Sequence, residues 1–205
     1  MITIIDYEMG NVGSIQNMFK YLGIKSVIES NPDKIKNASK ILLPGVGAFD
    51  TAMKKIKERN LDEVLNEKVL KEQVPILGIC LGMQLLTNSS EEGELEGLGL
   101  ISAKTIGFKQ SIKKQLKVPH MGWNTIKIVQ KNPLTLGFEK LDETRFYFVH
   151  SYFVKVNDEK NSLFKTDYGL EFDSAIVKDN IFGAQFHPEK SHKFGMKLFE
   201  NFARI

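Results

Sequence analysis

Hydrophobic and polar residues follow two alternating periods along the first half of the chain. Short runs rich in branched apolar residues, which are typical of buried strands, occupy 2–6, 26–29, 40–43 and 75–79. Apolar residues at helical spacing predict helices at 11–22, 50–59, 61–71 and 81–87, with Asp50 as the N-cap of the second. Strands that alternate with helices over short connections indicate a parallel sheet.

The second half of the chain has strand patterns without helices between them. These patterns predict strands at 125–129, 145–149, 152–156, 174–178 and 181–185, whereas 161–169 is rich in turn-forming residues. An amphipathic helix at 193–203 follows the last strand. We therefore predict a single α/β domain over residues 1–205, built on a doubly wound, mostly parallel sheet with helices on both faces and an antiparallel strand addition in its second half.

Composition excludes several classes of protein. Of the 205 residues, 42% are hydrophobic and 26% are charged, as in ordinary globular proteins. The formal net charge of +3 is too small to suggest a nucleic-acid ligand. The start of the chain lacks the pattern of a secretory leader, and the longest mainly apolar stretch, 76–86, is too short to span a bilayer. We expect a cytoplasmic protein that does not enter membranes.

The single cysteine, Cys80, excludes an intrachain disulfide and a cysteine zinc cluster, and we expect neither a metal nor another cofactor. It lies between a predicted strand and a predicted helix in Gly78-Ile79-Cys80-Leu81-Gly82. This spacing is typical of a sharp strand–turn–helix elbow, in which the residues two before and two after the nucleophile must be small. Free N–H groups at the start of the helix favour a thiolate. A lone cysteine is more often an inert core residue, but the flanking glycines favour catalysis.

A thiol nucleophile needs a base, and His187-Pro188-Glu189 offers one directly after a predicted strand. On extended backbone, residues i and i+2 project to the same side, so Glu189 can accept a hydrogen bond from one imidazole nitrogen while the other faces the thiol. Cys80, His187 and Glu189 then have the roles of nucleophile, base and orienting group. A His-x-Glu sequence alone is more often part of the surface.

Two glycines follow the third predicted strand in Pro44-Gly45-Val46-Gly47. They allow the backbone to approach a ligand closely or to change conformation. Loops at the carboxyl ends of parallel strands gather in one crevice, so this segment is a candidate for completing an oxyanion hole at Cys80. The alternative is a plain turn between a strand and a helix.

Five motifs, in order along the chain, together resemble those of the class I, triad-type glutamine amidotransferases. They are PGVGAF (44–49), GICLGMQ (78–84), PHMGWN (119–124), YFVHSYF (147–153) and QFHPEKS (185–191). The third and fourth motifs are similar to those of glutaminase subunits of imidazole glycerol phosphate synthase, from histidine biosynthesis. The resemblance covers nearly the whole chain and implies a flavodoxin-like fold.

The resemblance implies that the chain hydrolyses glutamine to glutamate and ammonia. Cys80 would attack the side-chain amide of glutamine, His187 would carry the proton, and Glu189 would complete the triad. The matched positions imply an oxyanion hole made by the backbone of Gly45, Val46, Gly47 and Leu81. They also imply a glutamine-binding group of Gln84, Glu92, Ser151 and Tyr152.

The resemblance also implies a heterodimer in which ammonia passes to a (β/α)8-barrel cyclase subunit. Positions that match the family's interface or ammonia passage are Asn11, His120, Met121, Gly122, Trp123, Asn124, Tyr147 and Lys190. Trp123 is the only tryptophan, and it is either a core residue or an exposed interface anchor. Glu8 departs from the family, which usually has a small residue there, near the partner face.

Three other functions remain open at this stage. A paralogous glutaminase subunit that feeds ammonia to a surface-sugar amidating synthetase would carry the same catalytic motifs. A cysteine hydrolase of another class would leave Gln84 and the His187-Pro188-Glu189 motif unexplained. A catalytically silent binding subunit would have an unreactive Cys80.

Overall fold

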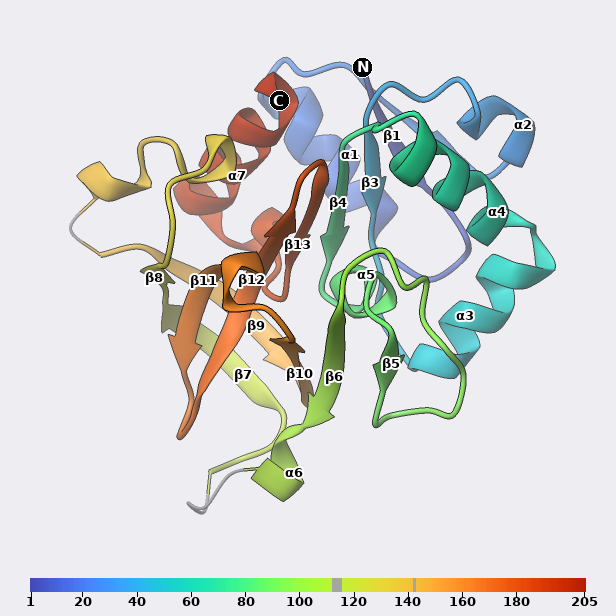
Figure 1. Cartoon of the computed structure of the whole chain (residues 1–205). Helices are drawn as coiled ribbons and strands as arrows, with labels where there is room; N and C mark the ends of the chain where they lie inside the picture. Colours follow the sequence, from blue (N-terminus) through green and yellow to red (C-terminus); the bar gives the residue numbers. More distant parts are fainter. Residues whose placement is uncertain (112–115, 142) are drawn as a thin grey trace.

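The computed structural model describes residues 1–111, 116–141 and 143–205, and one large mixed sheet runs through this part of the chain (Figure 1). Its first half is parallel. The parallel strands, in spatial order, are β2 (Ser26–Glu29), β1 (Ile2–Ile5), β3 (Ile41–Leu43), β4 (Ile76–Ile79) and β13 (Ile181–Ala184). Apart from the half-buried edge strand β2, these strands are nearly continuous apolar runs because helices cover both of their faces.

The second half of the sheet is mainly antiparallel. It continues from β13 through β12 (Glu171–Lys178), β10 (Tyr152–Val156), β6 (Ala103–Gly107) and β5 (Ser89–Ser90), of which the last pairs parallel to its neighbour. Two further strands, β11 (Ser162–Asp167) and β8 (Lys127–Ile128), extend from β12. A separate antiparallel ribbon consists of β7 (His120–Thr125) and β9 (Arg145–His150). The predicted doubly wound sheet with an antiparallel addition is confirmed.

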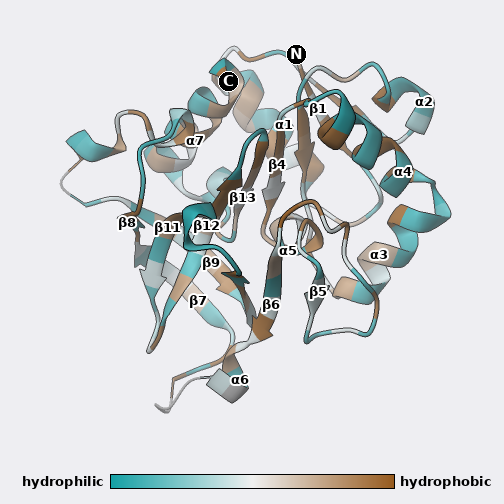
Figure 2. Cartoon of the chain, in the orientation of Figure 1, coloured by the Kyte–Doolittle hydropathy of each residue, from teal (hydrophilic) through white to brown (hydrophobic). Residues whose placement is uncertain are grey.

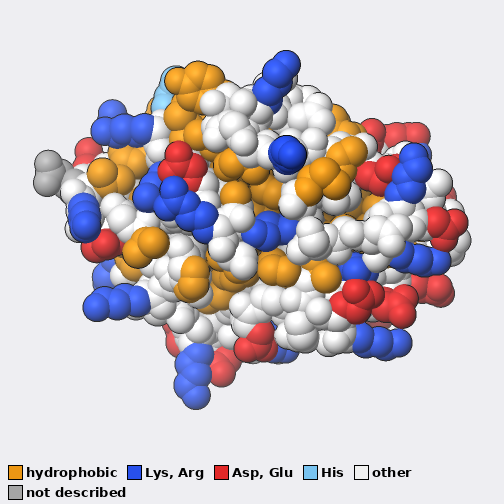
Figure 3. Space-filling view, turned by 90° about the horizontal axis from the view of Figure 1, so that it is seen from above, with side chains coloured by type: hydrophobic (Ala, Val, Ile, Leu, Met, Phe, Trp, Pro, Cys, Tyr) orange, Lys and Arg blue, Asp and Glu red, His pale blue; other side chains and the backbone are white. Residues whose placement is uncertain are grey.

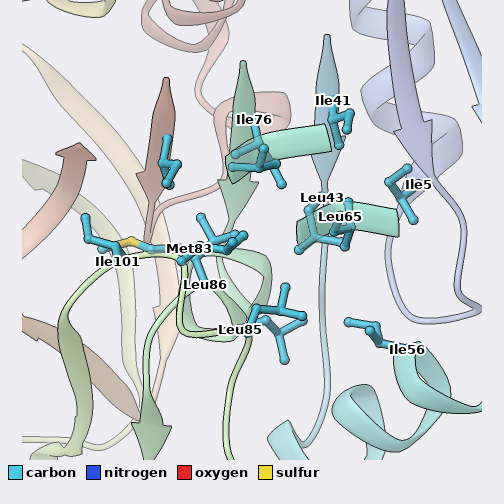
Figure 4. Packing of buried hydrophobic residues seen from close by; sticks show 14 of the residues in the cluster. Ile5, Ile41, Leu43, Ile56, Leu65, Ile76, Met83, Leu85, Leu86 and Ile101 are labelled. Carbon is cyan, nitrogen blue, oxygen red and sulfur yellow. The ribbon is translucent and has the colours of Figure 1, made fainter. Parts of the chain in front are cut away.

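Helices pack on the two faces of the parallel half. One face carries α2 (Pro32–Ile35), α3 (Phe49–Glu58), α4 (Leu61–Asn66) and α5 (Leu81–Leu85), and the other carries α1 (Val12–Tyr21) and α7 (His192–Arg204). Successive residues of β3 alternate between two core clusters, since Ile41 and Leu43 join the first and Leu42 joins the second. Figure 4 labels Ile5, Leu43 and Leu65 among the residues of the first cluster.

Short helical segments complete the described secondary structure. They are the turn α6 (Phe108–Ser111), the π-helical turn Glu67–Lys71, which extends α4, and four 3-10 turns at Pro133–Thr135, Phe138–Lys140, Glu159–Asn161 and Pro188–Lys190. Figure 2 shows hydrophobic central strands and helices whose outer sides are hydrophilic. Seen from above in Figure 3, Lys and Arg side chains lie among Asp and Glu side chains. Within the described ranges no helix is long and apolar enough to cross a membrane.

The start of α3 differs from the prediction. The helix begins at Phe49, one residue before Asp50, and Ala48 is its N-cap without a side-chain hydrogen bond. The Phe49 N–H instead donates to the carboxylate of Glu92, at 3.0 Å. The Asp50 carboxylate accepts from the backbone N–H groups of Glu94 and Leu95, at 3.1 Å each, so it fastens a neighbouring loop and does not cap its own helix.

Two predictions for the second half were wrong, one of a strand and one of a turn-rich segment. The strand expected at 125–129 is split, because β7 begins at His120 and β8 covers only two residues. The turn-rich segment 161–169 contains β11, which pairs with both β12 and β8 and so satisfies its backbone within the sheet. The sequence pattern also missed β6, whose alternately buried residues lie between β10 and β5.

Candidate active site

Cys80 lies at the sharp turn between β4 and α5, and the predicted elbow is present. Its φ of 54° and ψ of −112° are values that side-chain-bearing residues rarely adopt. A Cβ on Gly78 would lie 2.6 Å from the carbonyl oxygen of Gly82. A Cβ on Gly82 would lie 1.9 Å from the carbonyl oxygen of Leu43. Both positions therefore need glycine to let the strand and the helix approach.

His187 and Glu189 form a buried pair. The Nδ1 atom of His187 is 2.8 Å from Oε1 of Glu189, and the two side chains are only 4% and 2% exposed. Their meeting does not come from extended backbone, as the sequence suggested, because Glu189 lies in the 3-10 turn Pro188–Lys190. The Nε2 atom of His187 is buried and makes no hydrogen bond among the described residues, so it is the nitrogen left for proton exchange.

The electrostatics of this pair favour the charged imidazolium. Burial lowers the pKa of His187, but its interactions with Cys80 and Glu189 outweigh that effect and raise the pKa above its ordinary value. The side chains of Cys80 and Glu189 are the two neighbours that raise this pKa. The arrangement therefore favours an imidazolium at His187, which is the kind of neighbour that activates a cysteine nucleophile.

Backbone contacts behind His187 fix its position. The His187 N–H donates to the carbonyl of Tyr147 on β9, at 2.9 Å. The Ser191 hydroxyl donates to the His187 carbonyl at 2.6 Å and accepts from the Tyr147 N–H at 3.0 Å. A Cβ on Gly195 would lie 1.7 Å from the Pro188 carbonyl oxygen, so this glycine lets α7 pack against the turn. Sequence reasoning missed Ser191 and Gly195, because their roles depend on a distant strand and on helix packing.

The sulfur of Cys80 lies beside a second buried side chain that sequence reasoning did not single out. The Nε2 atom of Gln185 donates toward Sγ over 3.8 Å, and the Val149 carbonyl oxygen lies 4.0 Å from the sulfur. Gln185 is fully buried directly after β13. The sequence did contain one sign of this role, since a polar amide occupies the last position of a predicted strand. A buried amide needs a hydrogen-bond partner.

The glycine segment after β3 lies directly against the elbow. The Leu81 N–H donates to the Gly45 carbonyl, at 3.3 Å, so this donor is already occupied by the protein's own backbone. A Cβ on Gly45 would lie 2.6 Å from the hydroxyl oxygen of Tyr7, whose hydrogen bond to the Pro44 carbonyl, at 2.7 Å, anchors the segment. Gly47 has a φ of 102°, in the region that favours glycine.

A pocket opens above the elbow. It has a volume of about 350 Å³, within the usual range for small-molecule sites. All the residues predicted to bind glutamine line it, together with two of the three triad candidates and part of the glycine segment: Val46, Gly47, Cys80, Leu81, Gln84, Glu92, Ser151, Tyr152 and His187. Residues from both halves of the sheet thus meet at one cavity.

Two of the predicted glutamine-binding side chains have structural partners. Burial raises the pKa of Glu92, the hydrogen bond from Phe49 opposes this, and the charge of Asp50 adds to it. The amide nitrogen of Gln84 donates to the Tyr152 carbonyl at 3.3 Å and to Oε1 of Gln185 at 3.1 Å. Among residues 1–111, 116–141 and 143–205, no group of three or more His, Cys, Asp or Glu side chains is placed to hold a metal ion.

The residues predicted at the partner interface separate into exposed and buried ones. Met121 is 61% exposed and Trp123 is 43% exposed, so Trp123 is not a core residue. The Trp123 ring stacks on His192, with ring centroids 5.6 Å apart, and Lys190 lies over the ring of Tyr147. Asn11 is exposed and caps α1 through a hydrogen bond from the Ser14 N–H.

His120 and Glu8 depart from their expected surroundings. His120 is 2% exposed and hydrogen-bonded to His150, so a direct contact with a partner is not open to it. Glu8 has a φ of 68° and forms ion pairs with Lys55 of α3 and with Arg59, the residue that follows α3. These pairs lower the pKa of Glu8 and hold the loop after β1 against α3.

Comparisons with known proteins agree with this geometry. The profile of the family "Glutamine amidotransferase class-I" matches residues 3–205. "Imidazole glycerol phosphate synthase subunit HisH 2" of Methanococcus maripaludis is 58% identical over 100% of this chain and 99% of its own length. The subunit HisH of Sulfurimonas denitrificans is 53% identical over 100% and 98%. A solved structure described as a glutamine amidotransferase covers both chains fully with a TM-score of 0.76 at 16% identity, which shows the shared fold. The chain therefore belongs to the class-I glutamine amidotransferase family.

Proposed function

We propose that this chain is the glutaminase subunit of an imidazole glycerol phosphate synthase and that Cys80, His187 and Glu189 carry the reaction. The observation that carries the proposal is the buried His187–Glu189 pair, 2.8 Å apart, in which His187 lines the same pocket as the strained Cys80. Full-length identity of 58% to a subunit of that name supports the choice within the family. It also disfavours a cysteine hydrolase of another class.

The first half of the reaction is attack on the glutamine side-chain amide. The Cys80 thiolate adds to the amide carbon, and the carbonyl oxygen takes the negative charge. His187, protonated at Nε2, then gives its proton to the amide nitrogen, which leaves as ammonia while the carbonyl re-forms as a thioester. Glu189 holds the ring through Nδ1 and stabilises the imidazolium.

The second half is hydrolysis of the thioester. The neutral His187 takes a proton from water, the resulting hydroxide equivalent attacks the thioester carbon, and Cys80 leaves as a thiolate. Glutamate is released, and His187 is again protonated. A working thiolate is best preserved in reducing surroundings, for which we propose the cytoplasm.

The oxyanion hole has to be opened for this chemistry. The Leu81 N–H is the donor nearest the nucleophile in sequence, and the Gly45 carbonyl occupies it at 3.3 Å. Turning the peptide between Gly45 and Val46 would remove this carbonyl and bring the Val46 N–H to the same side. Val46 is 44% exposed and the next residue, Gly47, already has a positive φ, so the segment has room for such a rotation. We propose that partner binding drives it.

Glutamine recognition uses other residues that line the same pocket. Glu92 supplies a half-buried carboxylate for the ammonium group, and Ser151 and Tyr152 supply backbone groups for the carboxylate. Gln84 supports the Ser151–Tyr152 wall of the pocket through its hydrogen bond to the Tyr152 carbonyl.

The partner is a cyclase subunit, for which we propose a (β/α)8-barrel fold and a heterodimeric complex. Exposed Met121, Trp123 and Lys190 are the candidate contact residues, and Lys190 also lines the pocket, so ammonia released there lies close to this surface. Trp123 is a suitable anchor because large aromatic side chains dominate the energetics of interfaces.

The experiment measures glutamate released from glutamine by this chain mixed with a purified histidine-pathway cyclase. We expect the cyclase's nucleotide substrate to stimulate release strongly, because an occupied cyclase should favour the open oxyanion hole. A cyclase that is active on ammonium salts but gives no stimulated release would contradict the histidine-pathway assignment.

Cys80→Ala provides the second arm of this experiment. It should abolish synthesis from glutamine and leave synthesis from ammonium salts intact, because the variant lacks only the nucleophile. Loss of both activities would mean that Cys80 supports the complex structurally. Unchanged synthesis from glutamine would favour the silent-subunit interpretation.

A second candidate is the paralogous subunit that serves a surface-sugar amidating synthetase. The name of the Methanococcus relative carries the number 2, and Glu8 stands where the family usually has a small residue. This candidate predicts the same glutaminase chemistry without stimulation by the histidine-pathway nucleotide. The mixing experiment above therefore separates the two candidates.

A further inference from the structure

Two buried histidines lie at the pocket, and the proposed chemistry does not use them: His150 lines the pocket, and His120 is hydrogen-bonded to it. Nδ1 of His120 is 2.9 Å from Nε2 of His150, and the two residues are 2% and 6% exposed. His120 is stacked between Phe148 and Tyr168, with ring centroids 4.7 and 4.0 Å away. A buried polar pair of this kind is costly unless every ring nitrogen has a partner.

The hydrogen bonds fix which nitrogens carry protons. A carbonyl oxygen can only accept, so Nδ1 of His150 carries the hydrogen that binds the Tyr152 carbonyl at 2.7 Å. In a neutral ring Nε2 of His150 must then accept, and the hydrogen comes from Nδ1 of His120. Nε2 of His120 in turn accepts from the side-chain amide of Asn124, at 3.2 Å. Every ring nitrogen is satisfied.

The outer end of this series of hydrogen bonds, at Asn124, is also fixed. The amide nitrogen of Asn124 donates to the Asp167 carbonyl at 2.9 Å, and its oxygen accepts from the Thr125 N–H at 2.8 Å. These contacts leave the amide only one orientation. Asn124 lies on β7, the strand that also presents the exposed Trp123.

Both rings are held in the neutral form. Burial lowers the pKa of His120 to about 4 and that of His150 to about 3. For His150, the hydrogen bond to the Tyr152 carbonyl opposes this, whereas the nearby His120 and His187 add to it. An added proton on Nε2 of His150 would face the N–H of His120, so protonation and the observed hydrogen bonds are incompatible.

The inner end of this series of hydrogen bonds, at the Tyr152 carbonyl, reaches the wall of the glutamine pocket. The Tyr152 carbonyl that accepts from His150 also accepts from the Gln84 amide, at 3.3 Å. The Gln84 amide donates to Gln185 at 3.1 Å, and the Gln185 amide donates toward Sγ of Cys80 over 3.8 Å. A continuous series of polar contacts thus runs from β7 to the nucleophile.

We propose that His120 and His150 are positioning residues for glutamine binding, which hold the Ser151–Tyr152 wall of the pocket in place from β7 through the Tyr152 carbonyl. This inference rests on the proposed glutaminase function. Its physical basis is that His150 is the closer of the two donors to this carbonyl, at 2.7 Å against 3.3 Å for Gln84, and that Nε2 of His150 accepts from His120. Loss of the hydrogen bond between His120 and His150 should loosen the Ser151–Tyr152 wall and leave Cys80, His187 and Glu189 in place.

The test compares two substitutions at His120. His120→Phe keeps an aromatic ring between Phe148 and Tyr168 but supplies no donor to His150. His120→Asn places an amide N–H near the former Nδ1 and restores that donor. Tyr168→Phe is the matched control, because it keeps the stack and removes only the hydroxyl bond to the Lys117 carbonyl.

KM and kcat for glutamine are measured in the complex with the cyclase and its nucleotide. We expect His120→Phe to raise KM about tenfold, since a buried acceptor loses its donor. Its kcat should change less than KM, and His120→Asn and Tyr168→Phe should stay near wild type. An unchanged KM in His120→Phe, or an equal loss in His120→Asn, would overturn the proposal.

A second pair of variants covers a failure of His120→Phe to fold. His150→Asn keeps a donor for the Tyr152 carbonyl and should keep KM near wild type, whereas His150→Phe should raise it. Amide hydrogen exchange of residues 149–153 provides a readout that needs no glutamine. Faster exchange there in the Phe variants than in the Asn variants is expected, and equal exchange would overturn the proposal. If the wild-type complex releases no glutamate, the proposed function fails while the exchange result still decides the positioning role.

Discussion

Glu189→Gln tests the orienting role of the buried carboxylate. The substitution keeps the size of the side chain and removes its charge. The interaction that loses its charge is the 2.8 Å hydrogen bond between Nδ1 of His187 and Oε1, in which both side chains are almost fully buried. A hydrogen bond to a charged group contributes about 1.5–3 kcal/mol, which corresponds to a loss of about 10- to 150-fold in rate.

A second effect of this substitution acts on stability. Oε2 of Glu189 is buried without a hydrogen-bond partner in the described part of the chain. If the glutamine oxygen keeps the bond to His187, its NH2 group takes the Oε2 position and has no acceptor. An unsatisfied buried donor costs about 1–3 kcal/mol, so the free energy of unfolding should fall by about that amount. Glu94→Gln, which changes an exposed carboxylate, is the matched control.

The assay is the initial rate of glutamate release in the presence of excess cyclase and nucleotide, together with urea denaturation of the isolated chain. The expected order of activity is wild type, then Glu189→Gln, then His187→Ala and Cys80→Ala, because an orienting group contributes less than a base or a nucleophile. A rate within twofold of wild type would remove Glu189 from the triad. A loss equal to that of Cys80→Ala would show that Glu189 does more than orient.

Two further predictions concern stability. Gly82→Ala places a Cβ 1.9 Å from the Leu43 carbonyl oxygen and should lower the unfolding free energy by about 3 kcal/mol. Gly13→Ala is the control, because its Cβ meets nothing within 4 Å. It should leave the unfolding free energy unchanged or raise it by up to about 1 kcal/mol. Urea denaturation measures both unfolding free energies, and equal unfolding free energies for the two variants would contradict the close packing at the elbow. The folded-state pKa values of His120 and His150, about 4 and about 3, lie below the ordinary value, so their contribution to stability is present above about pH 6.5 and is lost as the pH falls. The double variant His120→Asn/His150→Asn lacks both histidines. Between about pH 6.5 and 5 its unfolding free energy should therefore fall by about 2–3 kcal/mol less than that of wild type. If the unfolding free energies of the two proteins change with pH in parallel, the two histidines are not held neutral.

The elbow could be predicted because its causes are local. A buried strand, a nucleophile and two glycines at fixed offsets lie within five consecutive residues, and the close approaches at Gly78 and Gly82 follow from that spacing. The parallel half of the fold was equally accessible, since β1, β3 and β4 are continuous apolar runs and the helices between them are amphipathic.

The remainder depends on contacts between distant segments. β11 contains few strong strand formers, but it pairs with β12 and β8. Glu92 has the sequence context of a surface loop, and it becomes half-buried because the start of α3 needs an acceptor. Gln185, Ser191 and the histidine pair have roles that only their partners reveal, because a hydrogen bond across the sheet leaves no periodic pattern in the sequence.

The measurement that tests the central claim most directly is alkylation of the complex by a glutamine-analogue chloroketone, located by mass spectrometry of the digested chain. A glutamine-shaped electrophile should react where glutamine binds next to an activated thiolate. We predict a single adduct on Cys80 that excess glutamine prevents and that His187→Ala strongly slows. Labelling at another residue, or no labelling of an intact complex, would contradict Cys80 as the nucleophile of a glutamine site.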